Sequence, residues 1–433
     1  MKTDPTKTEP AFPPPVLTDT ERASMYERFR SEVVAGGAVE EGETVSGAKG
    51  ALGILIIVGL LAWLGFANVW MLVFVLGILV AVLLHEFGHY ITAKWAGMKV
   101  TQFFMGFGPK LWSFKRGEVE YGVRALPLGA FVRIIGMSNV DEVEPADEAR
   151  AYRQKPYRWR MLVICAGSMM HFLIAIALLL GVYTFAGRPE QGDRVQFATI
   201  AEGGPAAAAG VETNDIVLSV DGVEATSPAQ VTDAIRSHEP GETVTLELLR
   251  DDTPTTIAVV LGERPDDPTT AFLGVSSADE FTYEQHGFPA TVGYVVTDMW
   301  RGAVESVKGV VTVMNPVNLW DHLTGQSDDL ATRPTTLVGA TDASSAIGEV
   351  DGLKGILLML AAVNVFFGLF NLFPLLPFDG GHAAIASYER LRSRRGKRYF
   401  ADVTKMMPVA LGVMALLGFM LFTGLYLDIA RPL

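Results

Sequence analysis

The stretch Leu83-Leu-His85-Glu86-Phe-Gly-His89 ends an apolar run that begins near residue 69. On a helix, His85 and His89 are four residues apart, so both imidazoles project from one face and can bind one metal ion. Glu86 follows the first histidine, and its carboxylate can take a proton from a water molecule activated by that metal. A surface helix that carries two histidines by chance is the alternative. Three ionisable side chains in a membrane-length apolar helix are costly and by default functional, which favours a metal site.

The overall composition is that of a membrane protein with a soluble portion. The chain has 433 residues, of which 49% are hydrophobic, and a mean hydropathy of +0.29. The single cysteine, Cys165, excludes a disulfide framework. A net charge of -13 argues against nucleic-acid binding. We expect no cleavable signal peptide, because the first apolar segment begins late in the chain.

Apolar runs predict about five transmembrane helices. The expected spans are residues 51–66, 69–84, 161–185, 353–376 and 406–426. A tight turn at 65–68 separates the first two, although one long tilted helix is an alternative. Residues 1–48 are rich in Pro, Thr, Glu and Gly, and they predict a disordered cytoplasmic tail.

Charge asymmetry predicts how the chain is oriented. Lys and Arg dominate the loop 94–160 and the segment 390–398, which places both in the cytoplasm. The segment 188–352 is acidic, as expected outside the cytoplasm. The prediction is therefore a multi-pass protein of the plasma membrane, with the metal site toward the cytoplasmic side. The first three spans and the basic loop form a unit over 51–185, and the last two form a unit over 353–428.

Alternating residues at 110–115 and 119–124, joined by Arg116-Gly117, predict a β-hairpin in the basic loop. Residues 128–136 are expected to add a third strand. A strand at the membrane suggests a sheet whose edge faces the metal site and pairs with an extended peptide. The alternative is that these strands only support the helix bundle.

The acidic segment contains a recognisable small domain. Residues 204–222 read as a short helix, a turn, a strand and an Asp-Gly turn, followed by a helix at 229–238 and strands at 244–250 and 256–261. This pattern resembles a PDZ domain of the bacterial, circularly permuted kind, expected over 188–265. Residues 272–275 are either its peptide-binding loop or a connector. The alternative is a small α/β domain that gates access without binding a peptide.

A connector is expected over 266–352. It includes an amphipathic helix at about 291–315, which lies along the membrane surface or packs beneath the PDZ domain.

A second motif, Asn371-Leu-Phe-Pro-Leu-Leu-Pro-Phe-Asp379-Gly-Gly-His382, ends the fourth span. Its prolines break helical hydrogen bonding and its glycines permit unusual backbone angles, so irregular backbone is expected at membrane depth. Asp379 is the natural third metal ligand, and water in the fourth position gives the open tetrahedral site of a catalytic zinc. His171 is a further intramembrane histidine, for which a hydrogen bond to a neighbouring helix is favoured over zinc ligation.

These motifs together resemble the site-2 proteases, the zinc metalloproteases of regulated intramembrane proteolysis. The resemblance rests on HEFGH, on Gly-Phe-Gly-Pro at 106–109, on the PDZ domain and on NLFPLLPFDGGH. It implies Zn²⁺ held by His85, His89 and Asp379, with Glu86 as general base. It also implies that Asn371 and the strand around Gly129 and Phe131 hold the unwound substrate. The span at 51–66 and the long N-terminal tail depart from the minimal members of the family.

The fold class expected is a polytopic α-helical membrane protein with about five transmembrane helices, a membrane-associated β-hairpin or sheet and an inserted α/β PDZ domain. The resemblance implies cleavage within the transmembrane helix of a single-span membrane protein such as an anti-sigma factor, or of a signal-peptide remnant, after an upstream site-1-type protease has trimmed it. The PDZ domain would then act as a size filter. A metal transporter is disfavoured because no internal repeat is found, and a non-catalytic PDZ membrane scaffold because Glu86 is intact.

Overall fold

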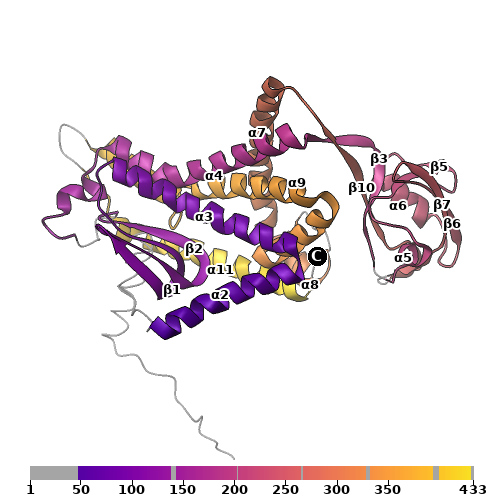
Figure 1. The fold of residues 1–433 in the computed structure, drawn as a ribbon, viewed down its shortest axis with the longest axis horizontal. Helices are drawn as coiled ribbons and strands as arrows, with labels where there is room; N and C mark the ends of the chain where they lie inside the picture. Colours follow the sequence, from indigo (N-terminus) through magenta and orange to yellow (C-terminus); the bar gives the residue numbers. More distant parts are fainter. Residues whose placement is uncertain are drawn as a thin grey trace, which may run out of the picture.

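The computed structural model describes residues 47–137, 143–201, 203–264, 267–327, 332–393 and 399–430. The predicted N-terminal tail lies outside these ranges, apart from its last two residues, which belong to the first described helix. Within the described residues, five helices are long and apolar enough to cross a membrane, which confirms the predicted fold class (Figure 1). They are α2 (Gly47–Ala67), α3 (Val69–Trp95), α4 (Tyr157–Phe185), α9 (Leu337–Asn371) and α11 (Met407–Ala430).

Asn68 separates the first two spans. It has extended backbone geometry, and its side-chain oxygen accepts hydrogen bonds from the backbone nitrogens of Trp70 and Met71, at 2.8 and 3.2 Å. Those two nitrogens have no partner within a helix, so this cap begins α3 cleanly. The same amide donates to Ser345 Oγ in α9 at 2.6 Å. The turn is therefore also fixed to the bundle, and α2 and α3 are separate helices.

The helices α3, α4 and α9 form the centre of the bundle (Figure 1). In the apolar window of α4, 44% of the residues are buried, against 6% in α2, so α4 is central and α2 is peripheral. Two clusters of small and branched apolar side chains join the three helices. They comprise Phe74, Ile78, Ile356 and Leu360 in one, and Ala175, Leu179, Ala361 and Val365 in the other.

Gly352 divides α9 into two parts. Its φ of 62° is a left-handed conformation that glycine adopts without a steric penalty, and it kinks the helix. The 19 residues from 353 to 371 span about 28 Å, which matches the hydrocarbon thickness of a bilayer. The predicted span at 353–376 thus corresponds to the second part of α9, which ends earlier, at Asn371.

The basic loop forms a sheet from two long strands, β1 (Val100–Arg116) and β2 (Val119–Ile134). Residues 110–116 pair with 119–124 as the predicted hairpin, and Phe104 lies opposite Gly122 on one side and Phe131 on the other. The strands therefore fold into a sheet that is wider than a simple hairpin. The bend in β1 falls at Gly106 and Gly108, whose φ angles of 87° and 82° favour glycine. The predicted separate strand at 128–136 is the end of β2, because the pairing of Phe107 with Leu126 keeps the ladder continuous.

A fully buried arginine lies inside this sheet. Arg124 lies against the stacked rings of Phe104 and Phe131, with its guanidinium carbon 4.9 and 5.2 Å from the two ring centroids. It donates a hydrogen bond to the carbonyl oxygen of Gly108 at 2.8 Å. This contact ties the bend of β1 to the middle of β2, so the cation–π stack shapes the loop that starts the hairpin.

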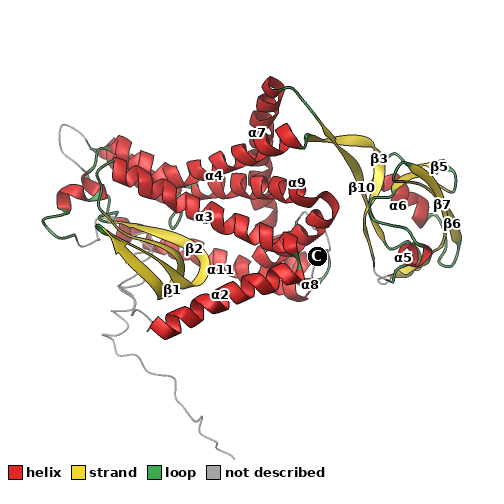
Figure 2. Ribbon diagram, viewed as in Figure 1, coloured by secondary structure: helices red, strands yellow, loops and turns green. Residues whose placement is uncertain are grey.

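The inserted domain is an α/β unit at the opposite end of the bundle from the β1–β2 sheet (Figure 2). Its main sheet has the strand order β10-β3-β4-β6-β7, with β5 paired to β4, and it is packed on the helices α5 (Pro205–Ala209) and α6 (Pro228–Arg236). The strands are β3 (Arg188–Ile200), β4 (Ile216–Val220), β5 (Val223–Glu224), β6 (Thr243–Arg250), β7 (Thr253–Val260), β8 (Gly262–Arg264), β9 (Asp267–Phe272) and β10 (Val275–Glu284). Buried Val, Leu and Ile from the sheet and from α6 form a core of its own.

The domain extends beyond residue 265, the end that we predicted for it. The strand β10 pairs with β3 from Val275 opposite Ile200 to Glu284 opposite Arg188. The residues that we assigned to a connector therefore complete the sheet, because the first strand needs a partner along its whole length. The paired ends of β3 and β10 form a ribbon that links the domain to the membrane helices (Figure 1).

Helix α7 (Phe288–Val313) runs across the bundle and is followed by α8 (Pro316–Thr324). Val295 and Met299 of α7 pack with α4 and α9 side chains, whereas Trp300 on another face is 71% exposed. Arg188 at the base of the ribbon pairs with Asp298 of α7 at 3.0 Å. The predicted amphipathic helix therefore packs on the bundle with one face and presents a second apolar face outward.

Asp428 joins the end of the last span to the start of α9. Its side chain is fully buried and accepts hydrogen bonds from Thr336 N and Gly339 N, at 2.8 and 3.1 Å, and from Thr336 Oγ at 2.6 Å. Arg333 lies 3.4 Å from the other carboxylate oxygen. A carboxylate at a helix N-terminus accepts from backbone groups that the helix leaves without partners.

Replacing Asp428 by Asn should lower the free energy of unfolding by about 1–3 kcal/mol, because an amide nitrogen would face buried N–H donors and the ion pair to Arg333 would be lost. The measurement is thermal unfolding of the purified protein in detergent. The control is Glu305→Gln, which removes an exposed ion pair with Lys308. Equal melting temperatures for the two variants would contradict the role given to Asp428.

Candidate metal centre

The two histidines are positioned by a close crossing of α3 and α4. A Cβ atom added at Gly88 of α3 would lie 2.7 Å from the carbonyl oxygen of Ala166 in α4. One added at Gly167 of α4 would lie 2.6 Å from His85 Nε2 and would also collide with His89 Nε2. No larger residue fits at either position, and the two glycines let the helix backbones approach closely, as small residues do in membrane helix pairs.

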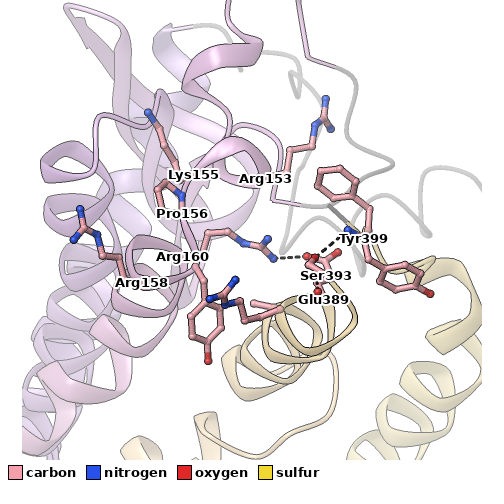
Figure 3. Close-up of a pocket in the computed structure, with 12 residues that line it drawn as sticks. Arg153, Lys155, Pro156, Arg158, Arg160, Glu389, Ser393 and Tyr399 are labelled. Atoms are coloured by element: carbon pink, nitrogen blue, oxygen red, sulfur yellow. Dashed lines mark hydrogen bonds and ion pairs between the residues drawn. The ribbon is translucent and has the colours of Figure 1, made fainter. Parts of the chain in front are cut away.

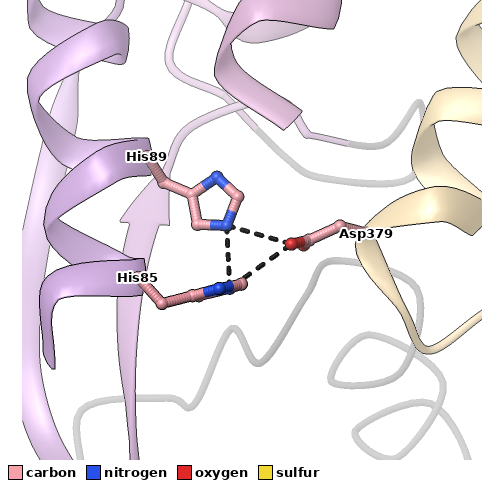
Figure 4. Close-up of side chains that lie close together, drawn as sticks. All are labelled: His85, His89 and Asp379. Atoms are coloured by element: carbon pink, nitrogen blue, oxygen red, sulfur yellow. Dashed lines mark hydrogen bonds and ion pairs between the residues drawn. The ribbon is translucent and has the colours of Figure 1, made fainter. Parts of the chain in front are cut away.

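Three ligand atoms converge next to this crossing (Figure 4). His85 Nε2 and His89 Nε2 are 3.2 Å apart, and Asp379 Oδ2 lies 3.3 Å from the first and 3.2 Å from the second. Both histidines are buried, with 7% and 8% of their surface exposed. The three atoms form a nearly equilateral triangle that closes on a shared centre.

The residues fit a zinc ion. Four tetrahedral bonds of about 2.0–2.1 Å hold the ligand atoms about 3.3–3.4 Å apart, close to the separations found here. Asp379 Oδ2 is buried and has no hydrogen-bond donor among the described residues other than the two histidines, as suits an oxygen that faces a cation. His89 Nδ1 lies 2.7 Å from the carbonyl oxygen of Val163. That contact holds the Nδ1–H tautomer and leaves the Nε2 lone pair for the metal.

Asp379 reaches the site through the irregular segment that the sequence predicted. Helix α9 ends at Asn371, residues 372–378 form turns, and α10 (Asp379–Arg392) begins at the aspartate itself. A Cβ atom at Gly381 would lie 2.5 Å from Leu376 N, and one at Gly380 would collide with the carbonyl of Leu372. Neither glycine has a positive φ. Our expectation of unusual backbone angles was wrong, since the two glycines serve close packing of the turn on α10.

Glu86 borders the three ligand atoms. Its Oε1 atom is 4.0 Å from His85 Nε2, and its side chain is 16% exposed. The backbone of Val132, in β2, lies close to the same carboxylate. The sheet therefore contacts the metal-site helix through the residue that sequence reasoning selected as a base.

His171 of α4 lies behind the ligands. Its ring centroid is 4.9 Å from that of His85, and its Nδ1 is 2.8 Å from Asn364 Oδ1 in α9. It is not part of the ligand cluster. The hydrogen bond to a neighbouring helix is the interpretation that we favoured from the sequence.

The predicted substrate residues lie on two elements: Gly129 and Phe131 on β2, and Asn371 at the end of α9. Asn371 is half-buried at the end of α9, and its side chain forms no hydrogen bond with the described residues. Phe131 is 4% exposed and stacks on Phe104 and Phe107. Its side chain is therefore occupied within the sheet, which leaves only its backbone for a partner. Gly129 packs against Phe107, where a Cβ would lie 2.6 Å from the ring.

Sequence reasoning missed Gly167 and Val163, whereas Val132 lies in the strand that was expected to face the metal site. A glycine and a valine in apolar stretches carry no chemical signal, and each acts through its backbone or through its lack of a side chain. Small residues in the neighbouring helix were the only available hint for Gly167. A second group of metal-binding side chains, Glu190, Glu284 and His286, sits at the ribbon. It is less suited to a metal because Arg188 already pairs with Glu190.

A buried His₂Asp cluster beside a glutamate lies in a bundle that includes, in the described ranges, five helices able to span a membrane, and it defines a membrane-embedded metallopeptidase. Comparison with known proteins agrees. Residues 73–415 match the model of Peptidase family M50. The chain is 33% identical to zinc metalloprotease Rip1 of Mycolicibacterium smegmatis over 84% of this chain and 98% of that protein. It is 32% identical to zinc metalloprotease Rip1 of Mycobacterium tuberculosis, over 83% and 97%. The chain belongs to Peptidase family M50, the site-2 proteases, and is a metalloprotease.

A solved PDZ domain of an SdrC-like protein from Listeria monocytogenes matches 21% of this chain and 92% of its own length, at 21% identity and a TM-score of 0.19. A TM-score this low does not establish a shared fold. The strand order and the two helices of the inserted domain remain the basis for describing it as a PDZ domain.

Replacing Gly167 by Ala should abolish stoichiometric metal binding, because the new methyl group would occupy the space between the two Nε2 atoms. The measurement is zinc content per chain after purification, expected to fall from about one to well below half. Gly181→Ala is the matched control in the same helix, since its Cβ would meet nothing within 4 Å. If both variants retain one zinc, the crossing does not define the site.

Proposed function

We propose that this protein is an intramembrane protease that hydrolyses a peptide bond within the transmembrane helix of a single-span membrane protein, after an upstream site-1-type protease has trimmed it. An anti-sigma factor or a signal-peptide remnant is the expected kind of substrate. The observation that carries the proposal is the triangle of His85, His89 and Asp379 with Glu86 beside it, inside the membrane bundle.

His85, His89 and Asp379 would hold the zinc ion. When bound, zinc would supply a Lewis acid that acidifies water and polarises the scissile carbonyl. Glu86 would accept a proton from the attacking water and then donate it to the leaving amine. Its carboxylate is 4.0 Å from His85 Nε2, close enough to share a water molecule with the ligands.

The β1–β2 sheet is suited to hold an unwound substrate. A helical peptide bond is internally hydrogen-bonded, so it must be opened before water can attack it. The segment of β2 that contacts Glu86 pairs with β1 on one side and has no strand partner on its other side among the described residues. Such an edge can pair with an extended peptide through backbone groups. Gly129 and the backbone of Phe131 lie on this segment, and Asn371 would act from the other side.

The charge pattern supports a cytoplasmic location for the sheet and the metal site, with the PDZ domain outside. The sheet and α10 are at one end of the bundle and the PDZ domain is at the other (Figure 1). A plasma-membrane protein in this orientation would receive substrates whose extracytoplasmic part must pass the PDZ domain.

The PDZ domain would act as a size filter. It is connected through the β3–β10 ribbon, whose base is anchored by Arg188 to Asp298 on α7. A cavity of about 350 Å³ between α6 and the loop 272–275 could take a short peptide, as the sequence suggested for this loop. A metal transporter is not favoured, because the described membrane helices contain one buried metal-binding cluster, with a glutamate beside it.

Glu86→Gln should abolish cleavage of a model transmembrane peptide while zinc content stays at about one per chain, because the amide cannot accept a proton and the three ligands are untouched. The measurement pairs peptide cleavage in detergent with metal analysis for wild type and variant, and a chelator should stop the wild type. If the variant still cuts at a comparable rate, Glu86 is not the base. Loss of zinc in the variant would instead assign Glu86 to the metal site.

Removing the PDZ domain should allow cleavage of an untrimmed substrate. Residues 192–280 would be replaced by a short Gly-Ser turn, which retains the pairing of Gln191 with Phe281 at the ribbon base. The measurement compares cleavage of one substrate with and without its extracytoplasmic domain. The same deletion combined with Glu86→Gln is the control and should cut neither form. Unchanged discrimination against the bulky form would contradict the filter.

A further inference from the structure

A cavity of about 460 Å³ lies between the first turn of α4 and the last turns of α10, away from the metal centre. Its lining is strongly basic. Five basic residues and one acidic residue line it, which gives the lining a net charge of +4 (5 − 1). They are Arg153, Lys155, Arg158, Arg160, Arg390 and Glu389.

Two of these cations already have carboxylate partners. Arg160 reaches from α4 to Glu389 of α10 at 2.6 Å, as Figure 3 shows, and Arg153 pairs with Glu148 at 2.6 Å. Lys155, Arg158 and Arg390 form no ion pair with any carboxylate in the described ranges. Their charge is left to attract an anion.

Backbone groups add to this field. Pro156 is the N-cap of the 29-residue helix α4, and its side chain accepts no hydrogen bond from the helix. The first N–H groups of α4, which point out of its N-terminus beside the cavity, are therefore not capped by a side chain. The N-terminus of a helix carries a partial positive charge and favours anions. The free cations and the helix end therefore act in the same direction.

The cavity lies at the level expected of a membrane surface. The apolar part of α4 begins immediately after Arg160, and exposed aromatic side chains lie in the lining: Tyr157 and Phe400 are 37% and 41% exposed. Aromatic rings together with Lys and Arg are typical of the boundary between lipid headgroups and hydrocarbon. A soluble anion would not need such a rim.

We infer that this cavity binds the phosphate of an anionic phospholipid of the cytoplasmic leaflet. The unpaired charges of Lys155, Arg158 and Arg390 at the cavity would attract the phosphate, and the aromatic rim would contact the start of the acyl chains. The inference goes beyond the proposed proteolysis and takes from it only the orientation in the membrane. Anionic lipids are attracted to basic pockets between membrane helices on that side.

The position of the cavity gives the lipid a structural consequence. Helix α10 begins with Asp379 at the metal centre, and Glu389, ten residues later, pairs with Arg160 at the cavity. The two ends are about 15 Å apart along one rigid helix. A phosphate that bridges α4 and α10 would brace the helix that delivers the third ligand.

The test is a lipid titration of the full-length purified protein, followed by thermal unfolding. Phosphatidylglycerol in mixed micelles should raise the melting temperature, and phosphatidylcholine with the same acyl chains should not. Inorganic phosphate at matched concentration is the control for a soluble anion and should change the melting temperature little. The variant Lys155→Gln/Arg158→Gln/Arg390→Gln should need about tenfold more phosphatidylglycerol for half of the shift.

The matched control is Lys115→Gln/Arg116→Gln/Lys405→Gln, which removes three exposed cations elsewhere on the predicted cytoplasmic side. It should titrate like the wild type. Equal weakening in both variants would show diffuse attraction to the surface and would overturn the site. A full shift with inorganic phosphate alone, or with phosphatidylcholine, would also overturn the assignment to an anionic lipid. Because thermal unfolding does not depend on proteolysis, the lipid titration tests the cavity even if the protein does not cleave the proposed substrates.

Discussion

The close approach of α3 and α4 is the constraint on which the rest of the structure depends. Because Gly88 has no side chain, α3 packs against the backbone of Ala166 in α4. Because Gly167 has none, the imidazoles of His85 and His89 pack directly against the backbone of α4. Because the ring nitrogens lie against a neighbouring backbone, their direction is fixed before any metal arrives. Preorganised ligands of this kind lose little entropy on binding, which favours tight and specific coordination.

The third ligand depends on a different kind of packing. Asp379 is the first residue of α10, and Gly380 and Gly381 allow the preceding turn to fold directly over the helix start. A side chain at either glycine would push the turn away and move the aspartate. The site is thus assembled from two sequence-distant segments, each held in place by glycines that give close contact and not by flexible loops.

Much of this arrangement could be predicted because it follows from local chemistry. The spacing of His85 and His89, the length of the apolar runs and the proline-rich turn before Asp379 each constrain the structure within a few residues. The full extent of β2, the strand β10 and the contact of Val132 with Glu86 could not be predicted in the same way. They depend on pairing between residues far apart in sequence, and strand pairing leaves only a weak local pattern.

Arg124 has a consequence for how the protein is made. Its guanidinium is fully buried against a stacked pair of phenylalanine rings, in a sheet that lies beside membrane helices. Exposing that charge to hydrocarbon during assembly would cost several kcal/mol, on the order of 3 or more. We therefore expect the chain segment between α3 and α4 to fold in water, with the arginine already covered, and to dock on the inserted helices afterwards. Biogenesis would then have an order, in which the lipid-inserted segments come first and the sheet completes the enzyme from the aqueous side.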